Sequence, residues 1–137
     1  MTTIKSYTDI EQSKKLAEIL PLESADMIYR PIMYIDSMSN SGFLDIPDCY
    51  PFNDFKNSII KPLPCWSLAA LLNIIPQEIF DGAYVINITE RNNNTWILTY
   101  GYRENRNHSY DGLSSNADYF IDACYEMILK LNELKLL

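Results

Sequence analysis

The sequence is short of the residues that metal centres and many enzyme sites need. It has a single histidine, His108, and three cysteines that stand far apart: Cys49, Cys65 and Cys124. Zinc and similar metals are bound by histidines and cysteines at close spacing, so the sequence predicts no metal site. It contains neither GxGxxG nor GxxxxGK[ST], the glycine-rich loops that hold phosphate groups. We therefore expect no metal and no nucleotide cofactor.

Positive charge is also scarce, with 11 Lys and Arg against 18 Asp and Glu, a net charge of -7. A nucleic-acid-binding surface needs clustered Lys and Arg to neutralise phosphates, so no nucleic-acid partner is expected. Acidic mimicry of nucleic acid is disfavoured because the carboxylates are scattered. No apolar run approaches the ~20 residues that span a bilayer, and residues 1–12 lack the apolar core of a signal peptide. Together with unpaired cysteines, this predicts a cytoplasmic protein without membrane contact.

At 137 residues, of which 47% are hydrophobic, the chain has the length and composition of one globular domain. Its most apolar stretch runs from Pro64 to Pro76 and is filled with helix formers. The apolar side chains point in nearly every direction around a helical period. We therefore expect a central helix that the other elements surround.

Two further helices are predicted at the ends of the chain. Thr8 and Glu11 have the spacing of a capping box, which starts a helix that runs to Leu20. Asn116 is expected to cap the last helix, in which apolar residues recur at three- and four-residue steps from Phe120 to Leu134.

The clearest β pattern is a hairpin of residues 83–91 and 95–103. A three-residue loop, Asn92 to Asn94, keeps the apolar faces of both strands on one side, whereas loops of two or four residues would mismatch them. It pairs Ile88 with Leu98, Ile86 with Tyr100, and Tyr84 with Tyr102. Residues 27–35 are expected to form an edge strand or two extended pieces interrupted by Pro31. Three other segments are predicted to be non-strand: a helical turn near residues 52–60, a second at 76–80, and a polar loop over 105–115.

The expected fold is therefore α+β: a short, mainly antiparallel sheet with a central hairpin, packed against a buried central helix and an amphipathic C-terminal helix.

Cys65 is the strongest candidate for a catalytic residue. At the start of a helix the dipole would lower the pKa of its thiol, and His108 follows later in the chain, as in papain-like cysteine hydrolases. However, Cys65 adjoins Trp66 in an apolar segment, and no segment indicates an oxyanion hole. A structural role in the core is favoured, so no catalytic residue is assigned.

A binding site is better indicated after the hairpin. Guanidinium groups next to aromatic rings suit a small anion or a nucleotide. The alternative is that Arg91 and Arg103 only flank a solvent-facing sheet edge and discourage pairing with other sheets. The predicted ligand-binding residues are Arg91, Arg103, Arg106, His108 and Tyr110.

Three segments carry a resemblance: IKPLPCWSLAALLN at 60–73, TDIEQSKKLAEILPLESAD at 8–26, and DACYEMILKLNEL at 122–134. They resemble a family of small uncharacterised proteins of phages and mobile elements of gut anaerobes. The resemblance covers under half of the chain and implies a cytoplasmic accessory protein of a phage or prophage, one that counters host defence by binding.

The expected function is thus a non-enzymatic interaction protein with a protein partner. The alternatives are a sponge for a small nucleotide signal and a cysteine hydrolase, and a homo-oligomer is left open.

Overall fold

The computed structural model describes residues 5–32, 42–55, 57–59, 61–92 and 94–137. The chain divides into two compact units, one of residues 6–70 and one of residues 71–137 with residues 1–5. The expected single domain stays a prediction. Helix α2 (Leu68–Ile74) crosses the boundary between the units.

The α+β class is confirmed, because the described chain combines α-helices with two antiparallel sheets and ends in a helix. Among the described residues, one sheet has two strands and the other has four. No helix in the described part of the chain has the length and apolarity needed to cross a membrane.

In the first unit, helix α1 (Ile10–Ala17) begins one residue later than predicted. Its cap is Asp9, whose carboxylate accepts the Gln12 N–H at 2.8 Å while Gln12 accepts the Asp9 N–H at 3.0 Å. The capping box expected at Thr8 and Glu11 is therefore wrong by one position. Thr8 is fully buried instead, and its hydroxyl lies 2.8 Å from the hydroxyl of Ser13.

A two-stranded sheet pairs β1 (Met27–Tyr29) with β2 (Leu63–Cys65). Beyond β1, Pro31 forms only an isolated bridge with Phe43, and the rest of the predicted strand, residues 33–35, lies outside the described residues. Two short 3-10 helices complete the unit, η1 (Leu22–Ser24) and η2 (Phe52–Phe55), the second of which lies where a helical turn was predicted.

The central helix is shorter than its apolar composition suggests, because Leu63–Cys65 is a strand and the helix begins only at Leu68. Asp26 explains this start: its carboxylate accepts the backbone N–H and the hydroxyl of Ser67, and Ser67 in turn accepts the Ala70 N–H. Leu71 is buried, whereas Leu72 is 37% exposed. The expectation of a helix without a solvent face is therefore wrong.

The second unit contains a four-stranded sheet in the order β3-β4-β5-β6. The hairpin of β4 (Tyr84–Arg91) and β5 (Thr95–Tyr102) has the predicted register, with Arg91 opposite Thr95. Asn92 has a φ of 54°, the left-handed conformation that a tight loop needs. β3 (Glu78–Ile79) pairs with β4 where a helical turn was expected.

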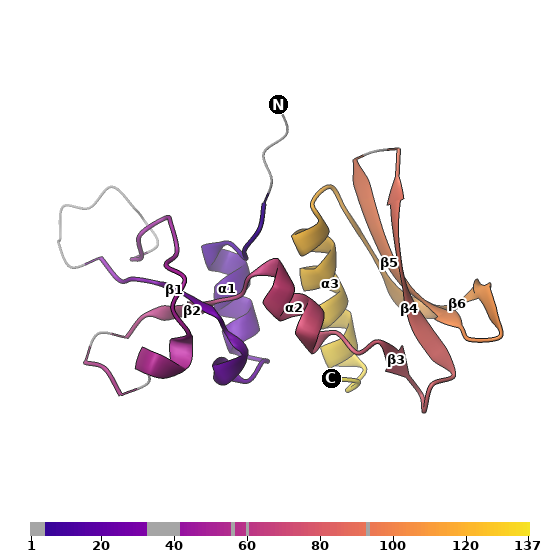
Figure 1. The fold of residues 1–137 in the computed structure, drawn as a ribbon, viewed down its shortest axis with the longest axis horizontal. Helices are drawn as coiled ribbons and strands as arrows, with labels where there is room; N and C mark the ends of the chain where they lie inside the picture. The colour runs from indigo at the N-terminus through magenta and orange to yellow at the C-terminus, as the bar shows by residue number, and fades with distance from the viewer. Residues whose placement is uncertain (1–4, 33–41, 56, 60, 93) are drawn as a thin grey trace. The chain divides into compact units, whose positions relative to one another are not determined.

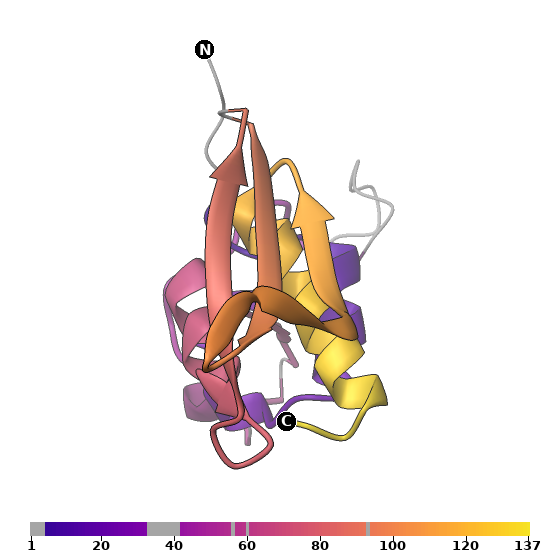
Figure 2. The same cartoon turned by 90° about the vertical axis from the view of Figure 1, so that its right-hand side faces the viewer.

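The segment predicted as a polar loop is the strand β6 (Asn105–Ala117). It pairs with β5, and two irregularities near Gly101 curl its first half across the sheet (Figure 2). Asn116 therefore lies in a strand opposite Ile97 and does not cap the last helix. That helix, α3 (Phe120–Glu133), begins after Tyr119, which makes no side-chain cap.

Helix α3 packs along β5 and β6 and contributes six buried residues to the core of this unit (Figure 1). The ring of Phe120 stacks on Trp96 at 4.6 Å with an interplanar angle of 7°. The hydroxyl of Ser115 on β6 donates to the Ala123 carbonyl at 2.7 Å, which fixes the helix against the strand. The buried residues of α3 are Ile121, Ala123, Cys124, Met127, Ile128 and Leu131.

Candidate functional site

The turn between β3 and β4 has an unusual backbone. Phe80, Asp81 and Gly82 have φ values of 54°, 56° and 88°, so three successive residues are left-handed. Glycine accepts this conformation freely, but a bulky residue such as Phe80 is an outlier that costs on the order of 1–3 kcal/mol. Strain of this kind collects at functional sites.

The strained turn presents an aromatic cluster at the surface. The ring centroid of Phe80 lies 6.0 Å from that of Tyr84 and 5.2 Å from that of Tyr110. Tyr84 in turn contacts Tyr102 at 5.6 Å and Tyr110 at 5.3 Å. Phe80 is 45% and Tyr102 36% exposed, so these rings are not sealed in a core. We call Phe80, Tyr84, Tyr102 and Tyr110 the aromatic cluster.

Arg103 is fixed beside this cluster by two contacts. Its Nε donates to the Gly82 carbonyl at 2.6 Å, and its Nη2 lies 2.5 Å from Oε2 of Glu78. Both side chains of the ion pair are more than half exposed, so the pair adds little stability. Its main effect is to hold the guanidinium in one orientation at the strained turn.

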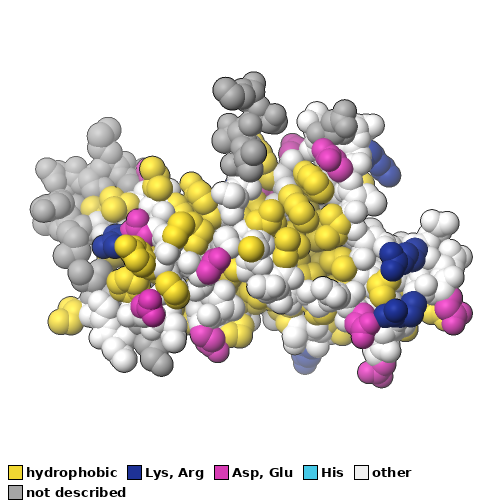
Figure 3. Space-filling model, viewed as in Figure 1, with side chains coloured by type: hydrophobic (Ala, Val, Ile, Leu, Met, Phe, Trp, Pro, Cys, Tyr) yellow, Lys and Arg dark blue, Asp and Glu magenta, His cyan; other side chains and the backbone are white. Residues whose placement is uncertain are grey.

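Two shallow hollows meet at the Arg103–Glu78 pair. One has a volume of about 340 Å³ and is lined by both side chains together with Asp81, Tyr102 and Glu104. The other has a volume of about 430 Å³ and is lined by the same pair together with Gln77 and Arg106. Figure 3 shows basic and acidic side chains next to one another at this end of the sheet. Neither hollow is a purely cationic pocket.

The structure brings together only some of the predicted binding residues. Arg103 and Tyr110 belong to this site, and Arg106 lines the second hollow. His108 is an exposed residue of β6. Arg91 lies at the opposite end of the hairpin, seven strand positions from Tyr84, a separation of roughly 23 Å at about 3.3 Å per residue.

Sequence reasoning missed Phe80, Glu78 and the site role of Tyr84 and Tyr102. Phe80 was assigned to a helical turn, and the two tyrosines only to the apolar face of the hairpin. A local signal is present in Asp81-Gly82, a dipeptide typical of turns, but it does not indicate that Phe80 shares the left-handed backbone.

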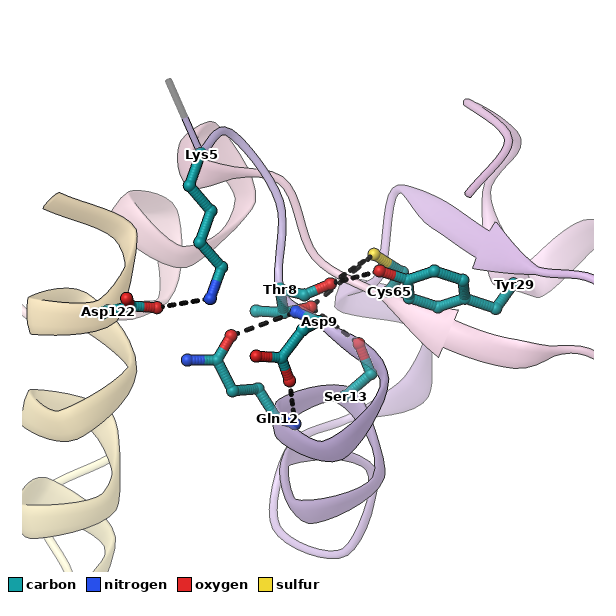
Figure 4. A network of polar contacts seen from close by, with 8 residues as sticks. All are labelled: Lys5, Thr8, Asp9, Gln12, Ser13, Tyr29, Cys65 and Asp122. Atoms are coloured by element: carbon teal, nitrogen blue, oxygen red, sulfur yellow. Dashed lines mark hydrogen bonds and ion pairs between the residues drawn. The ribbon is translucent and has the colours of Figure 1, made fainter. Parts of the chain in front are cut away.

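Cys65 is not placed as a nucleophile. It lies in strand β2 and is fully buried, so it receives no helix dipole. Its Sγ donates to the Thr8 carbonyl at 3.4 Å and lies 3.6 Å from the Thr8 hydroxyl (Figure 4). Burial raises the pKa of the Cys65 thiol, which disfavours the reactive thiolate.

The buried contacts around Cys65 form a structural network. The Thr8 hydroxyl lies 2.8 Å from that of Ser13 and accepts the Trp66 N–H at 3.2 Å. The Tyr29 hydroxyl donates to the Thr8 carbonyl at 2.7 Å, and burial raises the pKa of Tyr29. The geometry thus assigns the thiol to packing and hydrogen bonding.

No group of three or more metal-ligating side chains occurs among the described residues. No family model, curated protein or solved structure matches the chain.

Proposed function

We propose that the protein is a non-enzymatic interaction protein that binds another protein through the aromatic cluster and Arg103. The observation that carries this proposal is Phe80, a large apolar ring held at the surface by a strained backbone. Folding alone would favour a relaxed turn with a buried ring. Tyrosine and arginine are also the residues that most often dominate the binding energy of protein interfaces.

The charges around the cluster support a protein partner more than a phosphate ligand. Glu78 neutralises Arg103, and Asp81 and Glu104 line the same hollow. A phosphate group placed there would meet three carboxylates and one guanidinium. A polypeptide surface, which carries both signs of charge, can satisfy all four groups.

The resemblance to phage and mobile-element proteins suggests the cellular context in which the protein would bind its partner. In that setting the partner is a host defence protein in the cytoplasm, and binding blocks its action.

Site-specific photocrosslinking in the cells that naturally carry the gene tests the proposal. Benzoylphenylalanine replaces Phe80 in one variant and Tyr102 in a second, and a control variant carries it at Glu18, an exposed residue of the other unit. We expect the two site variants to give one shared adduct of discrete mass, absent from the control. Identical adducts from all three positions, or none from the site positions, would refute the proposal.

A nucleotide sponge is the second candidate function. Arg106 and the hollow of about 430 Å³ favour it, because the volume lies within the range of small-molecule sites. Thermal shift against cyclic and linear nucleotides tests this candidate. A ligand at about 100-fold excess over Kd should stabilise the fold by about 2.7 kcal/mol. Stabilisation that Arg106→Ala abolishes would favour the sponge over the interaction protein.

A further inference from the structure

The four-stranded sheet has an unpaired strand edge away from the aromatic cluster. β3 covers β4 only at Tyr84 and Val85, with one more hydrogen bond from the Ile86 N–H to the Gln77 carbonyl at 2.9 Å. From residue 87 to 91, no strand among the described residues pairs with β4 on this side. This segment is the open β4 edge.

The direction of each backbone group follows from two hydrogen bonds. The Ile86 N–H points to β3, whereas the Ala83 carbonyl accepts the Arg103 N–H on the β5 side. Because backbone groups alternate along a strand, the N–H and C=O groups of Ile88 and Glu90 point out of the sheet at the open β4 edge. They offer two donors and two acceptors at strand spacing.

The other edge of the sheet, which β6 forms, is protected. On β6 the outward residues are Ser114 and Asn116, and the ammonium group of Lys130 binds the Ser114 carbonyl. Lys130 belongs to α3, and its charged side chain occupies an acceptor that an added strand would need. The two edges of the sheet are therefore unequal, and the open β4 edge is the accessible one.

Apolar side chains border the open β4 edge on one face. Ile88 is 40% exposed and stands opposite Leu98, with Trp96 as its diagonal neighbour on the same face. Trp96 is partly buried against Phe120 of α3. In Figure 3 this edge faces the viewer, and hydrophobic side chains gather beside it toward α3. The opposite face carries Asn87 and Thr89.

We propose that the open β4 edge binds an extended segment of another protein, which adds to the sheet as a fifth strand. The segment runs antiparallel to β4, with an apolar side chain opposite Ile88 and a lysine or arginine opposite Glu90. Polar side chains alternate with these two. Main-chain hydrogen bonds provide affinity and the alternate side chains provide specificity. This surface is separate from the one in the proposed function.

A second copy of this chain fits the edge poorly. Two copies would pair through their β4 edges as antiparallel strands related by a twofold axis. One register places Glu90 opposite Glu90 of the other copy, so that like charges meet. The next register places the apolar Ile88 opposite the charged Glu90. The third pairs Ile88 with itself but puts the partner strand where Gln77 already lies. Two chains of net charge -7 also repel each other. A basic segment of a different protein avoids all of these penalties.

The test uses an acetylated and amidated peptide, Thr-Lys-Thr-Val-Thr, titrated into the ¹⁵N-labelled protein. We expect saturable shifts of the Ile88 and Glu90 amide signals and slower hydrogen exchange at both. The Thr89 amide, which already faces β5, should change little. A peptide that is N-methylated at valine should bind at least tenfold more weakly.

Two variants complete the test. Glu90→Pro removes one outward N–H and no hydrogen bond to β5, and we expect it to weaken binding at least tenfold. Ile88→Lys leaves the backbone unchanged and should weaken binding as well, whereas Glu18→Gln should not. The proposal fails if the peptide does not bind, if N-methylation has no effect, or if the free protein is a dimer that Glu90→Pro dissociates. Failure here leaves the crosslinks at Phe80 and Tyr102 unaffected, so the two proposals are separable.

Discussion

Replacing Thr8 with valine tests the buried network of the first unit. Threonine and valine have nearly the same shape, so Thr8→Val removes the hydroxyl and leaves no cavity. The side chain is 0% exposed, and a rule based on hydrophobicity alone would predict a more stable protein. The structure predicts the opposite, because that hydroxyl lies 2.8 Å from the Ser13 hydroxyl and accepts the Trp66 N–H at 3.2 Å.

The magnitude follows from the groups that lose their partner. The Trp66 N–H and the Ser13 hydroxyl are both buried, and an unsatisfied buried polar group costs about 1–3 kcal/mol. We expect Thr8→Val to lower the free energy of unfolding by about 2–6 kcal/mol, a large part of a typical total of about 5–15 kcal/mol. Thr8→Ser keeps the hydroxyl and loses one methyl group, at a cost of about 1 kcal/mol.

Urea denaturation followed by circular dichroism measures these differences. The expected order of stability is wild type, then Thr8→Ser, then Thr8→Val, with an unchanged m value. A double-mutant cycle with Ser13→Ala should give a coupling energy of about 0.5–3 kcal/mol. If Thr8→Val is as stable as the wild type, or more stable than Thr8→Ser, the argument from buried hydroxyls is refuted.

Two further predictions concern the second unit and the buried thiols. A Cβ at Gly101 would lie 2.7 Å from the Arg106 carbonyl oxygen and 2.5 Å from Asn87 Nδ2, so Gly101→Ala should cost about 1–3 kcal/mol in urea denaturation. Adding Asn87→Ala should not restore the loss, since the backbone contact remains; full rescue would contradict the close approach of β6. Burial raises the pKa of Cys124 to about 12 and also raises that of Cys65. The unfolded thiols ionise first, so above roughly pH 8.5 stability should fall by up to about 1.4 kcal/mol per pH unit for each thiol. Cys124→Ala should reduce this slope in denaturation curves between pH 8 and about 11, and an unchanged slope would show that Cys124 ionises equally in both states.

The hairpin was predictable because its two strands specify each other locally. Alternating apolar residues define one face of each strand, and only a loop of three residues brings those faces together. The last helix was predictable for the same reason, since its apolar period is internal to the segment. The start of that helix was not, because Asn116 has the chemistry of a cap and yet pairs with Ile97 in β6.

The candidate site was only half predictable. Arg103 and Tyr110 belong to it, but Arg91 does not. Arg91 lies at the loop end of the hairpin and the site lies at the other end, so the length of the strands separates them. Phe80 was missed because its conformation depends on pairing of β3 with β4, which no local pattern announces. The strain at that turn follows from the pairing.

The sequence by itself determined the α+β class, the register of the hairpin and the amphipathic C-terminal helix. Each of these depends on periodicity within a short segment. Only the tertiary structure made a strand of the polar segment from Asn105 to Ala117, because a strand with few apolar residues forms where a neighbour, β5, leaves its backbone hydrogen bonds open. It also decided that β4 extends past β3, with an edge that no strand of the described residues pairs, since the length of a pairing is a property of two strands together.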